Sequence, residues 1–201
     1  MINVLSRMKR TCRKVSSLFA RDESGIAAIE FGFIALPFFA ILVAIFQIGI
    51  IFLAQNELET AVEKASRQLL TGQVQKNGTT QSQFLTSICA NLPVFFTCSS
   101  ANDGSGVMVD VSLASSFASA NTSPPSLTYD KNGNVSNSWN FNTGAAGSIL
   151  VLRIFYQFPV FLGPLGLNLA NLPGSKHLMV ATAVFQVEPY QSMGSSIGSG
   201  S

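Results

Sequence analysis

A stretch of 24 uncharged residues, Phe31–Ala54, constrains this chain more than any other feature of its sequence. As a helix it is about 36 Å long at 1.5 Å per residue, and the hydrocarbon core of a bilayer needs only about 20 residues. The run is apolar on all sides, whereas a helix on the surface of a soluble domain keeps a polar face. We therefore expect a transmembrane helix over residues 26–54, with a buried helix of a soluble core as the weaker alternative.

Charge is distributed unevenly about this run. Charged residues make up only 11% of the chain, and residues 1–25 hold six of the twelve Lys and Arg. An excess of Lys and Arg keeps one flank of a membrane helix in the cytoplasm. We therefore expect residues 1–25 to form a basic cytoplasmic leader and the C-terminal part to lie outside the cytoplasm. Because the net charge is only +2, we expect no nucleic-acid partner. The low share of charged residues and the apolar run indicate a lipid bilayer as the partner instead.

Glu30 is an acidic residue inside the apolar sequence, where a carboxylate costs about 2.5 kcal/mol or more on insertion scales. One interpretation is a side chain that reaches the interface. The other requires a positive partner at the same depth. Cleavage after Gly25 would give Ile26 a free α-amino group one helical turn before Glu30, and the two opposite charges would neutralise each other within one chain or between neighbours.

The sequence at this junction resembles the processing site of Flp-type pilins and pseudopilins, in which Gly is followed by four apolar residues, Glu, and Tyr or Phe. Gly25, Glu30 and Phe31 occupy the matching positions. The longer stretch 25–49 resembles the start of TadE-like proteins of the tight-adherence (Flp) pilus system. Two later motifs are similar to the same family, an alanine-rich helix with Ala61, Ala65, Arg67 and Gly72, and a closing Val187-Glu188-Pro189-Tyr190.

The resemblance implies a non-enzymatic, pseudopilin-like protein of the bacterial inner membrane that acts in Flp pilus assembly. It implies cleavage by a prepilin-type peptidase after Gly25, and other Flp pilus assembly proteins or pilins as partners. The role of fibre subunit and that of assembly factor both stay open. A different interpretation is an uncleaved single-pass anchor that displays an adhesive or sensory β domain.

Residues 55–76 are expected to continue the helix beyond the membrane. Apolar residues recur there at steps of three and four, which places them on one helix face: Leu58, Ala61, Val62, Ala65 and Leu69. Gly72 is a plausible end of this helix. The proteins that the chain resembles use such a helix as a spine covered by a small sheet, and a juxtamembrane stalk is the simpler alternative.

Residues 77–190 are expected to form an extracytoplasmic antiparallel β domain. Residues 106–113 alternate in polarity, and residues 148–161 and 178–187 are apolar on both faces, as in central strands. Pro159 is expected to end the second strand or to place it at an edge. The predicted fold class is therefore α+β, a pilin-like arrangement of one long N-terminal helix on a small antiparallel sheet.

The stretch 114–147 is rich in Ser, Asn and Gly and is expected to be a long exposed loop. Asn132-Gly133 is a strong turn signal, which predicts a hairpin near residues 128–139. Residues 191–201 are expected to be a flexible tail. Cys89 and Cys98 lie outside the predicted membrane helix, where an oxidising compartment favours a disulfide over two buried thiols.

The sequence offers little for catalysis, cofactors or metals. A Ser–His–Asp site would have to use His177, the single histidine, with Asp103, Asp110 or Asp130, and the G-x-S-x-G elbow is missing. With one His and dispersed acidic residues, we expect no metal site, no cofactor and no catalytic residue. A membrane-tethered hydrolase that depends on His177 is the remaining enzymatic alternative.

Overall fold

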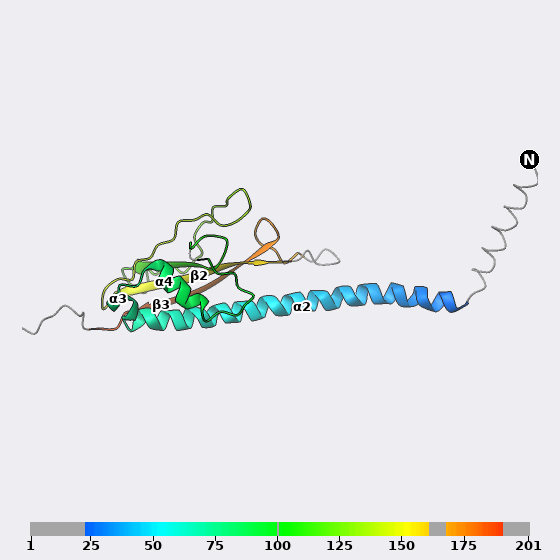
Figure 1. The fold of residues 1–201 in the computed structure, drawn as a ribbon, viewed down its shortest axis with the longest axis horizontal. Helices are drawn as coiled ribbons and strands as arrows, with labels where there is room; N and C mark the ends of the chain where they lie inside the picture. Colours follow the sequence, from blue (N-terminus) through cyan, green and yellow to red (C-terminus); the bar gives the residue numbers. More distant parts are fainter. Residues whose placement is uncertain (1–22, 100, 161–167, 191–201) are drawn as a thin grey trace, which may run out of the picture. The chain divides into compact units, whose positions relative to one another are not determined.

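The computed structural model describes residues 23–99, 101–160 and 168–190. The chain divides into two compact units, residues 1–46 with 163–167 and residues 47–162 with 168–201. The secondary structure of the described residues, with the labels of Figure 1, is α2 (Glu23–Leu70), α3 (Gln73–Lys76), α4 (Gln81–Cys89), β1 (Met108–Ala114), β2 (Ile149–Pro159) and β3 (Lys176–Gln186). The predicted tail and residues 1–22 of the predicted leader lie outside the described residues, whereas residues 23–25 of the leader already belong to α2.

Helix α2 is 48 residues long and continues through Pro37. Its second half carries the predicted apolar stripe, and all five members of that stripe are buried: Leu58, Ala61, Val62, Ala65 and Leu69. The helix ends at Leu70, and Gly72 follows in the left-handed conformation with φ 71°. The prediction that Gly72 stops the helix is therefore confirmed, because left-handed glycine is the common C-terminal signal.

The three strands form one antiparallel sheet in the order β1-β2-β3. In the centre of the sheet Leu152 of β2 pairs with Val111 of β1 and with Ala183 of β3. Strand β2 is central and ends at Pro159, as the sequence predicted. The α+β prediction is confirmed, with a long N-terminal apolar helix on a small antiparallel sheet.

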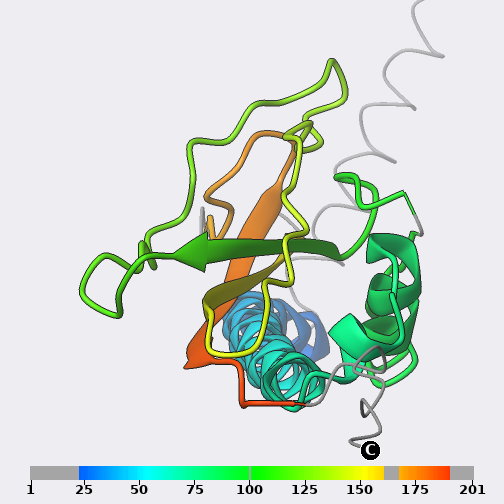
Figure 2. The same cartoon turned by 90° about the vertical axis from the view of Figure 1, so that its left-hand side faces the viewer.

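Both faces of the sheet are covered, which explains why β2 is apolar on both faces. One face packs on the C-terminal part of α2 and on α4 in the main core. Figure 2 looks along α2 and shows the strands above the helix, with α4 at their side. The other face carries a smaller cluster in which Met108, Val135 and Phe155 pack with Trp139 of the long loop.

Helix α4 was not predicted from the sequence, although its N-terminus carries a recognisable signal. Thr80 accepts a hydrogen bond from the backbone N–H of Gln83, and the Gln83 side chain accepts one from the N–H of Thr80. This reciprocal arrangement is a capping box, which the sequence T-x-x-Q would have indicated. The helix then buries Phe84, Leu85 and Ile88 in the main core.

The predicted hairpin in the long loop is present as a short antiparallel bridge between Tyr129 and Val135. Gly133 has φ 73°, as the Asn-Gly turn requires. Apart from isolated bridges at Phe141 and at this hairpin, residues 115–147 contain no strand or helix. The loop therefore has the irregular character that its composition predicted.

Candidate processing site and membrane helix

The residues of the predicted processing site lie in the first turns of α2. Gly25, Glu30 and Phe31 are all exposed, and the structure places nothing within 4 Å of a Cβ added at Gly25. Ile26 and Glu30 are four positions apart in a continuous helix, which corresponds to about 6 Å along its axis. A peptidase that read this motif would meet no packed side chain of the described residues around Gly25.

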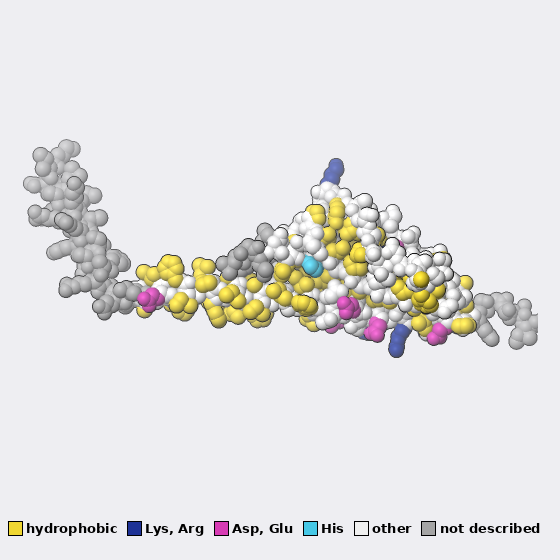
Figure 3. All heavy atoms as spheres, turned by 180° about the vertical axis from the view of Figure 1, so that it is seen from behind, with side chains coloured by type: hydrophobic (Ala, Val, Ile, Leu, Met, Phe, Trp, Pro, Cys, Tyr) yellow, Lys and Arg dark blue, Asp and Glu magenta, His cyan; other side chains and the backbone are white. Residues whose placement is uncertain are grey.

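The part of α2 that follows is coated with exposed apolar side chains. Phe31, Phe33 and Leu36 are each at least 70% exposed, and such residues continue to Leu53. In Figure 3, hydrophobic side chains cover the visible face of this helix. Among the described residues, one helix is long and apolar enough to cross a membrane, and its span is Ala27–Leu70. One apolar N-terminal helix of this kind fits a single-pass membrane protein.

The apolar run enters the protein core before it ends. Ile51 packs against the main core, and Ala54 is completely buried in it. One face of the last turn of the run is therefore covered by protein, whereas Phe52 and Leu53 on that turn stay exposed, as do most large apolar side chains of residues 29–46. The exposed stretch is long enough for most of a bilayer core of about 20 residues.

The helix motif that ends at Gly72 and the closing motif Val187–Tyr190 meet where α2 ends. The backbone N–H of Glu188 donates to the carbonyl of Leu70 at 2.9 Å. The ring of Tyr190 lies against Gly72, and the ammonium of Lys76 is 5.4 Å from the centroid of that ring. This contact fixes the end of β3 to the end of α2.

Cys89 and Cys98 are joined by a disulfide, in agreement with the sequence expectation. The bond ties the end of α4 to the segment that leads to β1. Beside it, the backbone N–H of Thr97 donates to the Tyr156 hydroxyl at 3.1 Å, and that hydroxyl donates to the carbonyl of Phe95 at 3.3 Å. The disulfide segment is thus held to the central strand by polar contacts as well.

A buried ion pair that the sequence did not reveal links β1 to β2. Arg153 donates to the carboxylate of Asp110 through Nε at 3.1 Å and Nη2 at 2.6 Å. Asp110 also accepts from the backbone N–H of Asn140, and Arg153 donates to the carbonyl of Ser123. The pair therefore anchors the long loop at two points.

The candidate catalytic residues are dispersed. His177 lies in β3 and its Nδ1 is 2.7 Å from the carbonyl oxygen of Leu169, whereas Asp110 is engaged by Arg153. Across the sheet, Asp110 of β1 lies opposite Arg153 of β2, which lies opposite Thr182 of β3. His177 is five residues from Thr182 along β3, so Asp110 and His177 are about 19 Å apart. Asp130 is bound within its own hairpin. Within the described residues no group of His, Cys, Asp and Glu could hold a metal ion.

Two carboxylates have perturbed acidity, and both act as local turn anchors. The hydrogen bond from the Ser105 hydroxyl lowers the pKa of Asp103 below its ordinary value of 3.8, and the backbone N–H of Ser105 acts in the same direction. The backbone N–H of Asn134, which donates to Asp130 at 2.7 Å, lowers the pKa of Asp130 in the same direction. The largest cause of each shift is a hydrogen bond within one turn.

Residues 25–67 match the family model of TadE-like proteins. This N-terminal segment is similar to TadE-like proteins. The matched stretch includes Gly25, Glu30, Phe31 and most of the buried stripe of α2, so it covers the exposed apolar part of this helix and its continuation under the sheet. No curated protein and no solved structure matches the chain. The TadE-like match suggests involvement in tight-adherence pilus assembly, in a family that is generally non-enzymatic.

Proposed function

We propose that the protein is a non-enzymatic, minor pseudopilin-like component of Flp pilus assembly, processed by a prepilin-type peptidase after Gly25. The observation that carries this proposal is the position of the Gly25–Phe31 motif. It occupies the exposed first turns of a long apolar helix, inside the segment that matches TadE-like proteins. No described atom lies within 4 Å of a Cβ built at Gly25, so no packed side chain crowds this side of the residue.

Cleavage would supply the positive charge that Glu30 needs in a membrane. The new α-amino group of Ile26 would lie one turn before the Glu30 carboxylate on the same helix. Two opposite charges that neutralise each other are less costly in lipid than either alone. An amine from a neighbouring subunit would serve as well, and this would couple processing to helix–helix assembly.

The proposal also implies an orientation of the chain in the membrane and a set of partners. The basic leader stays in the cytoplasm under the positive-inside rule, the helix crosses the bacterial inner membrane, and the sheet domain lies outside the cytoplasm. The partners are the prepilin-type peptidase and the other pilus assembly proteins or pilins. A bilayer surrounds the exposed apolar part of α2, whose large side chains have no protein cover among the described residues.

Two substitutions test the proposal in the native host. Gly25→Ala should block processing, whereas Glu30→Ala should leave the scissile bond intact and reduce pilus output or membrane retention. Glu57→Ala is the matched control, because Glu57 lies on the same helix beyond the uncharged run. Wild-type pilus output from both Gly25→Ala and Glu30→Ala would overturn the proposal.

A further inference from the structure

Strand β3 is an edge of the sheet, and the hydrogen bonds at its two ends show which backbone groups face outward. The N–H of Val187 donates to the carbonyl of Ser148, so the odd-numbered residues bond toward β2. The carbonyl of Lys176 accepts from the N–H of Leu172, which lies on the other side. Because these directions alternate along an antiparallel strand, the even-numbered residues of β3 point their N–H and C=O groups away from the sheet.

The opposite edge of the sheet is closed by the protein itself. At Val109 the side chain of Asn102 replaces a neighbouring strand, donating to the carbonyl at 2.9 Å and accepting from the N–H at 2.6 Å. At Val111 the N–H donates to Asn140 and the carbonyl accepts from Asn142, at 2.8 and 2.9 Å. Edge strands are usually protected in this way, because open edges recruit other strands.

The edge of β3 is partly closed, and only in its first half. The Asn171 side chain accepts from the N–H of Leu178 at 2.7 Å, and the Gln55 side chain donates to the carbonyl of Val180 at 3.2 Å. Beyond this point, the outward N–H and C=O groups of Thr182 and Val184 make no hydrogen bond to any other described residue. Half of the edge is therefore available to an added strand.

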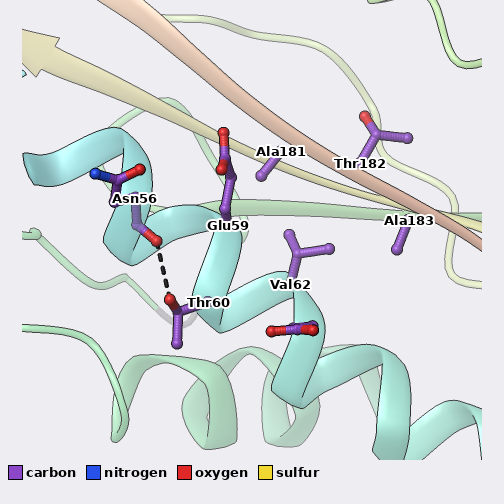
Figure 4. A pocket seen from close by; sticks show the side chains of 8 residues that line it. Asn56, Glu59, Thr60, Val62, Ala181, Thr182 and Ala183 are labelled. Atoms are coloured by element: carbon purple, nitrogen blue, oxygen red, sulfur yellow. Dashed lines mark hydrogen bonds between the residues drawn. The ribbon is translucent and has the colours of Figure 1, made fainter. Parts of the chain in front are cut away.

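An acidic groove of about 420 Å³ runs beside this open edge, between β3 and α2. Figure 4 shows the helix side chains, Glu59 and Thr60 among them, and the strand residues Ala181, Thr182 and Ala183 on the opposite wall. Glu59 and Glu63 line the groove, none of its lining residues is Lys or Arg, and neither glutamate has an ion-pair partner among the described residues.

We propose that this open edge and groove bind an extended, basic segment of a partner protein, which adds to the sheet as a strand beside β3. The backbone groups of Thr182 and Val184 would supply the main-chain hydrogen bonds, as in other cases of strand addition. Glu59 and Glu63 would attract Lys or Arg side chains that alternate along the segment. A second copy of this chain, paired through the same edge, would bring four of these carboxylates together. This inference goes beyond the proposed assembly role and does not depend on cleavage after Gly25.

The test uses the full chain in detergent and a fluorescein-labelled peptide of alternating Arg and Thr, with a peptide of alternating Glu and Thr as control. Thr182→Pro removes the outward N–H without touching the ladder to β2, and proline is tolerated at such edge positions. Thr182→Val keeps that N–H and is the matched variant. We expect the basic peptide to bind wild type and Thr182→Val alike, and Thr182→Pro at least about tenfold more weakly.

A second variant, Glu59→Gln with Glu63→Gln, leaves the strand intact and removes only the charge. This variant should bind the basic peptide several-fold more weakly, and the binding should depend less on salt. The proposal is wrong if the basic peptide does not bind, or if the acidic peptide binds equally well. It is also wrong if neither variant weakens the binding of the basic peptide. Self-association of the chain that Thr182→Pro abolishes would also overturn it, in favour of a second copy as the occupant.

Discussion

The ring of Tyr190 lies so close to Gly72 that a Cβ on this glycine would overlap it. Gly72 is the residue at which the chain turns after α2, and Tyr190 follows β3. The hydrogen bond between Glu188 and Leu70 lies beside this contact. Two short motifs that are far apart in the sequence therefore form one structural element, which fastens the sheet to its helix.

Gly72→Ala is expected to destabilise the protein by about 2–5 kcal/mol. The left-handed conformation costs an alanine about 1–2 kcal/mol, and displacing the Tyr190 ring adds about 1–3 kcal/mol of overpacking. Gly78→Ala is the matched control, because Gly78 has φ 59° and open space around it, so it should lose only the first of these amounts. Urea unfolding followed by the fluorescence of Trp139 measures the free energy of unfolding of both variants. Equal losses of stability in the two variants would show that the contact with Tyr190 does not stabilise the protein.

Asp110→Ala is expected to cost about 3–5 kcal/mol, because it leaves the guanidinium of Arg153 buried without its partner. The same change frees the N–H of Asn140, so amide exchange in the long loop should accelerate. Asp103→Ala removes an exposed carboxylate that binds only its own turn, and should cost less than about 1 kcal/mol.

Replacing both members of the buried pair, as Asp110→Leu with Arg153→Leu, should recover much of the lost stability. Two apolar side chains can fill the same site without a desolvation cost. A double variant no more stable than Asp110→Ala would show that the pair acts through its geometry and not through its charge.

Acid should loosen the hairpin that Asp130 holds. The N–H of Asn134 donates to this carboxylate and keeps its pKa below the ordinary 3.8, with further contributions from the Asn134 amide, the N–H of Asn132 and the positive charge of Lys176. Because the folded pKa is the lower one, the stabilisation is present above 3.8 and is lost as the pH falls through the folded value.

The measurement is amide exchange at Asn132 and Asn134 between about pH 5 and about pH 2, corrected for intrinsic rates. We expect protection to fall with a midpoint below 3.8, and Asp130→Asn to lack this transition. A midpoint above 3.8 would contradict the assigned hydrogen bonds.

Serine at both Cys89 and Cys98 should lower the free energy of unfolding by about 2–3 kcal/mol, because the short loop is no longer closed in the unfolded chain. A maleimide applied to the unreduced, denatured wild-type chain should leave both cysteines unmodified. Any label on Cys89 or Cys98 would contradict the disulfide.

The sequence predicted the parts of the fold that have a regular pattern. The steps of three and four from Leu58 to Leu69 identified the buried face of α2, and the alternation in residues 106–113 identified β1. A buried carboxylate has no such pattern, because Asp110 becomes distinctive only when Arg153 is opposite it in the sheet register. The open edge of β3 could not be predicted either, because the order of the strands depends on the whole chain and no local pattern indicates which strand lies at the edge.

The central claim is tested most directly by the N-terminal sequence and intact mass of the protein purified from membranes of its native host. Cleavage after Gly25 predicts a chain that begins at Ile26 and contains 176 residues, the 201 of the sequence less the 25 of the leader. Such a chain would also give Glu30 an amine within one turn. A protein that still carries residues 1–25 would contradict the account and indicate a permanent membrane anchor.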